Sequence, residues 1–148
     1  MKYKILKDGY DKNTGISFSN IATRYGEFSA TARLNPEDKE YESNFFGCQL
    51  AEARCVIKAL KEQLKIINVQ IKTLKDLKNK ILEIKGINEE NFIAAKELKM
   101  IVIELKKLYI KRVKVEQEIR NLKTAVAQRP EVRIFQIEKL LNSKDKKD

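Results

Sequence analysis

The spacing of apolar residues changes once along this chain, near Asn35, and this change constrains the fold more than any other feature. From Phe28 to Leu34 apolar and polar residues alternate, which is the period of a strand with one buried face. After about Leu50 apolar residues recur every three or four positions, which is the period of an amphipathic helix. The sequence therefore predicts an α+β fold, in which a small N-terminal sheet leads into very long helices.

Residues 1–35 are expected to form an antiparallel β-meander. The three predicted strands begin near Tyr3, Ile16 and Phe28. Turn-forming residues at Asp8–Gly9 and at 11–15 separate the first strand from the second. Residues 24–27 predict a hairpin turn, in which Gly26 is free to adopt a positive φ.

The first long helix is expected over residues 49–85. Its apolar stripe alternates steps of three and four, as in a heptad repeat: Leu50, Ala53, Ile57, Leu60, Leu64, Ile67, Ile71 and Leu74. The stripe then shifts to Leu77, which indicates a local change of register. Upstream, Asn35-Pro36 predicts a helix start, with a short helix or turn that is interrupted around Gly47.

A second long helix is expected over residues 89–127, and a short C-terminal helix over 130–142. The second stripe is again regular: Leu98, Ile101, Leu105, Leu108, Arg112, Val115, Ile119, Leu122 and Val126. A short turn around Gly86 makes the two long helices antiparallel neighbours. Residues 1–142 then form a single domain, followed by a disordered tail at 143–148. Because stripes of this length exceed what one small sheet covers, a homo-oligomer is expected.

Composition argues against catalysis. The chain has no histidine, which removes the usual general base and zinc ligand. Cys48 and Cys55 are seven residues apart, about 10 Å along a helix, too far for a disulfide. Isolated glycines exclude a phosphate-binding loop. We therefore expect no enzymatic activity, no metal site and no cofactor.

The expected location is the cytoplasm. No apolar run approaches the roughly 20 residues of a membrane span, and the N-terminus lacks the apolar region of a signal peptide. The net charge of +10 favours an anionic partner, although lysines on solvated helix faces explain it equally well. Polar residues between the sheet and the helices are the expected place for a ligand.

Arginines are the candidate binding residues, because guanidinium groups hold phosphates in bidentate fashion. Arg112 interrupts the second apolar stripe, either as a register marker or as an inward cation that binds an anion. Arg129 and Arg133 flank Pro130 and could form a phosphate clamp or lie on the surface. Arg54 either binds a ligand or pairs with an acid such as Glu52 or Glu27.

Three segments, Thr14–Ala22, Phe28–Leu34 and Gly47–Arg54, resemble the phage Thoeris anti-defence sponges of the first-described type. Arg129 and Arg133 resemble the C-terminal arginine pair of that family. The resemblance implies a non-catalytic protein that sequesters a cyclic ADP-ribose isomer, or a cyclic trinucleotide. It also implies an N-terminal antiparallel sheet, two long helices, and pockets shared by the protomers of dimers that combine into hexamers, in the host bacterial cell.

The resemblance also implies roles for individual residues. Ile21 and Ala22 would supply main-chain contacts, and Arg54, Arg129 and Arg133 would meet phosphates. An aromatic residue near the base of the ligand would be Phe92 or Tyr109.

Two other classes of protein remain open from the sequence. One is a basic coiled-coil protein that binds nucleic acid, against which stand the alternation of lysines with glutamates and the lack of a known DNA-binding motif. The other is a structural coiled-coil scaffold. Neither nucleic acid nor a membrane is the expected partner.

Overall fold

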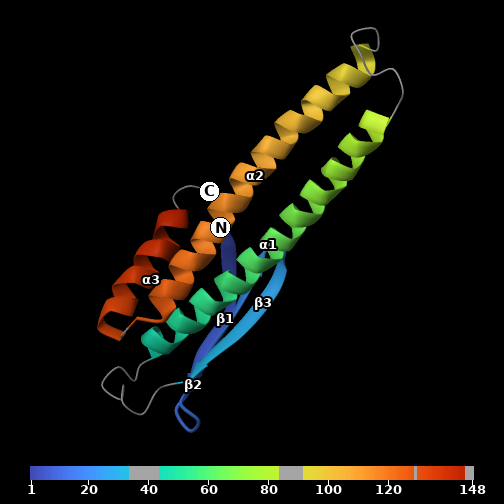
Figure 1. Ribbon diagram of the computed structural model, residues 1–148. Coiled ribbons are helices and arrows are strands. Elements are labelled where there is room, and N and C mark those ends of the chain that lie inside the picture. Colours follow the sequence, from blue (N-terminus) through green and yellow to red (C-terminus); the bar gives the residue numbers. More distant parts are fainter. Residues whose placement is uncertain (34–43, 84–91, 129, 146–148) are drawn as a thin grey trace. The chain divides into compact units, whose positions relative to one another are not determined.

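The computed structural model describes residues 1–33, 44–83, 92–128 and 130–145 and confirms the α+β class. Three strands precede three helices in the chain (Figure 1). Their bounds are β1 Tyr3–Asp11, β2 Ile16–Thr23, β3 Gly26–Arg33, α1 Asn44–Glu83, α2 Phe92–Val126 and α3 Pro130–Asp145. The chain divides into two compact units, one formed by Met1–Glu62 with Gln117–Asp148 and the other by Gln63–Glu116.

The sheet is an antiparallel meander in the order β1-β2-β3, as predicted. The second turn has Gly26 at φ 121°, which confirms the predicted positive φ. The first turn joins Asp11 to Ile16 and is closed by Gly15 N–H, which donates to Asp11 O at 2.8 Å. The predicted turn at Asp8–Gly9 is wrong: both residues lie inside β1, paired with Ser19 and Phe18.

Helix α1 packs against one face of the sheet through small side chains. Ser17, Ser19 and Ala32 are buried on this face. A Cβ atom added to Gly47 would lie 1.7 Å from Ser17 Oγ, so helix and strand are in close contact here. The predicted interruption around Gly47 is therefore wrong, because α1 starts at Asn44 and continues through this glycine. The lack of a side chain at Gly47 allows the helix to approach the strand closely.

The opposite side of this part of α1 forms the apolar core of the first unit. The core combines residues of α1, α2 and α3, among them Val56, Leu60, Leu122, Ile137 and Leu141, each at most 5% exposed. Gln49 Nε2 also donates to Ile134 O in α3 at 3.3 Å. Helix α3 extends to Asp145, three residues past the predicted end of the helix.

The second unit is a helical hairpin. Arg112 contacts Asn68 and Lys75 lies over Tyr109, so residue numbers rise on one helix as they fall on the other, as antiparallel packing requires. The buried residues are Ile67, Ile71 and Ile81 of α1 and Ile101, Leu105 and Val115 of α2.

Leu77 is 45% exposed, so the predicted shift of the stripe is wrong. The buried stripe instead continues with alternating steps of three and four residues, through the half-buried Lys78 to Ile81. The packed face of the helix therefore keeps its period along this stretch. The predicted cap at Gly86 lies outside the described residues. None of the described helices is long and apolar enough to cross a membrane.

Candidate ligand-binding site

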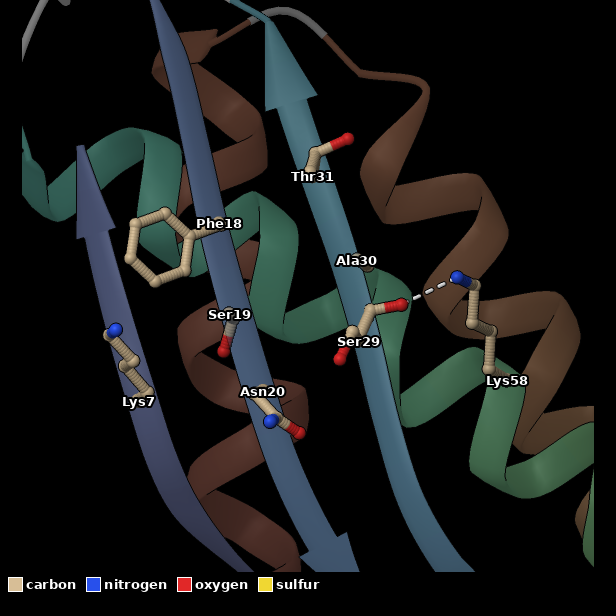
Figure 2. A pocket seen from close by; sticks show the side chains of 8 residues that line it. All are labelled: Lys7, Phe18, Ser19, Asn20, Ser29, Ala30, Thr31 and Lys58. Carbon is tan, nitrogen blue, oxygen red and sulfur yellow. Dashed lines mark hydrogen bonds between the residues drawn. The ribbon is translucent and has the colours of Figure 1, made fainter. Parts of the chain in front are cut away.

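A hollow of about 350 Å³ opens on the face of the sheet that α1 does not cover (Figure 2). All three strands and α1 contribute to it. The lining residues are Lys7, Phe18, Ser19, Asn20, Ser29, Ala30, Thr31 and Lys58. We call it the sheet hollow.

The pairing register brings the polar side chains of the sheet hollow together. Asn20 of the central strand is paired with Lys7 of β1 on one side and Ser29 of β3 on the other. Directly paired residues point to the same face of an antiparallel sheet. One cation, one amide and one hydroxyl therefore form a row across the three strands.

The outer edge of β3 is bound by two cations from α1. Arg54 Nη1 donates to Thr31 O at 2.7 Å, and Lys58 Nζ donates to Ser29 O at 2.5 Å. Residues four apart on a helix are separated by about 6 Å, and residues two apart on a strand by about 6.6 Å, so the two spacings match. In a strand, the N–H group of a residue points to the same side as its carbonyl. Arg54 and Lys58 therefore lie beside a row of main-chain donors.

Phe18 forms the apolar part of the sheet hollow. Its ring covers Gly9, the paired residue on β1, because a Cβ atom added to Gly9 would lie 2.7 Å from the ring. Lys7 Nζ lies 6.0 Å from the ring centroid, within reach of a cation–π interaction. The ring thus replaces the side chain that Gly9 lacks, which explains why glycine is tolerated inside β1.

The charge of the sheet hollow is positive. Its lining contains two lysines, and neither aspartate nor glutamate is among the lining residues. Over the described ranges, no group of three or more histidine, cysteine, aspartate or glutamate side chains is arranged to hold a metal ion. The hollow is therefore suited to an anionic organic molecule.

The two thiols lie on the other face of the sheet. Cys55 Sγ donates to Ser19 O at 3.3 Å, and Cys48 Sγ to Gly9 O at 3.5 Å. Burial, the largest cause, raises the pKa of both thiols. They are therefore protonated at neutral pH and act as small core side chains.

Of the predicted site residues, Arg54 binds the main chain of Thr31, a residue that lines the sheet hollow. It was expected to bind a ligand or to pair with Glu52 or Glu27, whereas the structure shows it donating to the main chain of Thr31. This bond uses one of the five N–H donors of a guanidinium group. A role for Arg54 in binding a phosphate stays a prediction.

Ile21 and Ala22 lie on β2, the central strand, and differ in the faces they occupy. The side chain of Ile21 is fully buried on the α1 side, whereas Ala22 is half-buried beyond Asn20 on the uncovered face. Both residues are paired with β1 and with β3, so the sheet uses their main-chain groups. A ligand on this face would meet the methyl group of Ala22.

Arg112 and Tyr109 lie together in the second unit. The Arg112 guanidinium is 5.0 Å from the Tyr109 ring centroid, 3.5 Å from Asn68 Oδ1 and 4.0 Å from the Glu116 carboxylate. Lys75 Nζ lies 5.5 Å from the same ring. These contacts are those expected of a polar register marker in the hairpin, and ligand binding by Arg112 or Tyr109 stays a prediction.

The C-terminal pair and the second predicted aromatic residue are only partly described. Arg129 lies outside the described residues, as does the side chain of Phe92 at the start of α2. Arg133 is half-buried on α3 and is not among the residues that line the sheet hollow. The predicted phosphate clamp therefore stays a prediction.

The sheet hollow lies on the opposite face from the one where a ligand was expected. The layer between sheet and helix is filled by Ser17, Ser19 and Gly47 at close range. Lys7, Phe18, Asn20 and Lys58 were not predicted as site residues. Two features of the sequence could have indicated this face. The alternation along β2 places Phe18 and Asn20 on the face opposite Ser17 and Ser19, and small residues four apart on α1 indicate the helix face that packs closely against a strand.

The chain was compared with protein-family models, with curated proteins and with solved structures, and none of the three comparisons gives a match.

Proposed function

We propose that this chain is a non-catalytic protein that binds and sequesters a small phosphorylated nucleotide. One observation carries the proposal: the sheet hollow places Lys7 and Lys58 beside hydroxyl and amide side chains, without a carboxylate in its lining. A phosphate ligand gains charge-assisted hydrogen bonds from such a site. The volume of about 350 Å³ lies in the range of small-molecule pockets, near its lower end.

The resemblance to the Thoeris anti-defence sponges narrows the proposed ligand to a cyclic ADP-ribose isomer or a cyclic trinucleotide, and the proposed role to phage evasion of a bacterial immune signal. A second protomer would complete the enclosure, because the hollow of one chain lies open on a sheet face. Apolar residues left exposed on the second unit, among them Met100, Ile103 and Ile110, give such a homo-oligomer a surface to bury.

The test is calorimetric titration of the protein with cyclic ADP-ribose, followed by heating of the complex and analysis of the released molecule. Saturable binding and recovery of the intact cyclic molecule are expected. Recovery of hydrolysed product would mean that the protein is an enzyme. A gel shift with duplex DNA at physiological ionic strength, together with no binding of the cyclic nucleotide, would favour the nucleic-acid alternative.

A further inference from the structure

We propose that Phe18 is a stacking platform for the nucleobase of the ligand, and that Asn20 reads the edge of that base. This inference rests on the proposed function, because it concerns the same sheet hollow. It divides the ligand chemically: the base contacts Phe18 and Asn20, and the phosphate contacts Lys58 at the edge of β3.

The geometry of Phe18 supports stacking because one face of its ring lies against Gly9, while the flexible Lys7 side chain, with Nζ 6.0 Å from the ring centroid, can move aside for a base. The ring lies across β1 against Gly9, where a Cβ atom would come within 2.7 Å of the ring atoms Cε1 and Cζ. Figure 2 shows the ring almost face-on, viewed from the uncovered side of the sheet. A flat base can therefore lie on the outer face of the ring, as bases do on aromatic residues of sheets that bind single-stranded nucleic acid.

Asn20 provides an independent observation beside the ring. It lies two residues from Phe18 on the same strand, and therefore on the same face. Its Oδ1 makes no hydrogen bond with any residue that the structure describes, and because this oxygen is covered by protein atoms, the side chain must turn for it to meet a base. A buried acceptor without a partner is costly, and an exocyclic amino group of adenine is a donor that asparagine commonly recognises.

Lys58 reaches the sheet hollow from α1 and already donates to Ser29 O at 2.5 Å (Figure 2). An ammonium group has three N–H donors, so the same group can also meet a phosphate oxygen. Phe18 and Lys58 belong to different elements at different sides of the lining. A base and a phosphate can therefore be held together in one hollow.

The test uses tryptophan as a reporter, because the chain contains none. In a Phe18→Trp variant the single indole replaces the proposed platform, and stacking of a base would quench its fluorescence. Phe135→Trp is the matched control, since Phe135 is 73% exposed on α3. The probes are cyclic ADP-ribose, adenosine 5′-monophosphate and ribose 5-phosphate.

The two adenine-bearing probes are expected to quench the Phe18→Trp variant, whereas ribose 5-phosphate does not, and the Phe135→Trp variant responds to none of them. Binding of cyclic ADP-ribose to the wild-type protein by calorimetry, without quenching of Phe18→Trp, would overturn the platform and leave the proposed function standing. Absence of binding by every probe, and also by a cyclic trinucleotide, would overturn both. Quenching by a single-stranded oligonucleotide, with none by either adenine-bearing probe, would overturn a small-nucleotide ligand.

Affinity variants separate stacking from folding. Phe18→Leu keeps an apolar side chain over Gly9 but removes the aromatic face, and should weaken binding of cyclic ADP-ribose on the order of 10- to 100-fold. Phe18→Tyr restores the face and should bind within about threefold of wild type. Equal affinity of the leucine and wild-type proteins, with unchanged thermal unfolding, would contradict the inference.

Discussion

At the residue scale, Gly47 illustrates how one atom decides where a helix meets a sheet. Glycine inside a helix is ordinarily less favourable than alanine by about 1 kcal/mol. Here a Cβ atom would lie 1.7 Å from Ser17 Oγ and 2.6 Å from Ser17 Cβ. The close contact with β2 therefore outweighs the low helix propensity of glycine. The sequence shows only the low propensity, and for this reason it suggested an interruption of the helix instead of a contact.

Gly47→Ala should lower the free energy of unfolding by about 1–3 kcal/mol, because overpacking costs more than helix propensity gains. Urea denaturation followed by circular dichroism measures the change. The matched variant is Gly47→Ala with Ser17→Gly, which removes the obstructing side chain and should recover part of the loss. A Gly47→Ala protein more stable than wild type would contradict the close contact.

The buried thiol of Cys55 predicts a loss of stability at alkaline pH. Burial raises its pKa above the ordinary value of 9.0, while Lys58 lowers it by less. Above about pH 9 the unfolded chain loses this proton and the folded chain keeps it, so the unfolded state gains stability as pH rises through that window. Below the ordinary pKa both states are protonated, and the contribution is constant.

The measurement is urea denaturation of wild type and Cys55→Ala at about pH 7 and about pH 9.5. The wild-type protein should lose more stability between the two values than the variant, since other groups titrate alike in both. Equal losses in the two proteins would show that the Cys55 thiol does not contribute.

At the element scale, the pairing of α1 with the edge of β3 determines the chemistry of the sheet hollow. Arg54 and Lys58, one helical turn apart, bind the carbonyl groups of Thr31 and Ser29. An edge strand whose carbonyl groups are bound in this way is also protected from pairing with another chain. The same two cations thus serve the fold and, in the proposed function, would offer charge to a ligand.

Lys58→Gln should weaken binding of cyclic ADP-ribose by about 1.5–3 kcal/mol, the usual range for a charged hydrogen bond. Lys61→Gln is the matched control, because it removes the same charge from an exposed position of α1 that does not line the hollow. Calorimetry distinguishes them. An equal, salt-dependent loss in both variants would indicate that overall charge, and not the sheet hollow, attracts the ligand.

The hairpin of the second unit gives a further prediction at this scale. Arg112 stands in an apolar stripe, and its side chain is 35% exposed beside Glu116. Contacts of this exposure contribute less than about 1 kcal/mol. Arg112→Leu should therefore leave the free energy of unfolding unchanged or raise it by up to about 2 kcal/mol through apolar burial. Urea denaturation measures the change, with Lys111→Leu as the control. If Arg112→Leu lowers the free energy of unfolding by more than about 1 kcal/mol while Lys111→Leu does not, Arg112 is not a replaceable register marker.

The strands and helices could be predicted from local sequence patterns, whereas the site could not. The apolar stripes of the long helices, the alternation from Phe28 onward and the turn residues at 11–15 and 24–27 were sufficient to predict the helices, the sheet and its strand order. Asp8–Gly9 was predicted as a turn from its residue types. The prediction failed because Gly9 is covered inside β1 by the ring of Phe18, which comes from another strand. Likewise the face covered by α1, and hence the position of Phe18 and Asn20, depends on contacts between distant segments that periodicity does not specify.

At the scale of the whole molecule, exposed apolar residues on α2 support the proposed self-association. Ile110 is 59% exposed and Ile103 is 45% exposed, on a helix whose other face is already packed. Ile110→Glu should shift the protein toward the monomer in light scattering coupled to gel filtration. Val132→Glu, at a 45% exposed position of α3, is the control and should leave the mass unchanged. A wild-type protein that is monomeric at all concentrations would contradict the proposed self-association.

Native mass spectrometry of the protein with a mixture of cyclic nucleotides tests the proposed sequestration most directly, since it reports subunit number and bound mass in one spectrum. We predict that each oligomer retains cyclic ADP-ribose or a cyclic trinucleotide, that heating releases it with its mass unchanged, and that Lys58→Gln reduces the bound fraction. Spectra in which no cyclic nucleotide stays bound, or in which the released mass is that of a hydrolysed product, would contradict it.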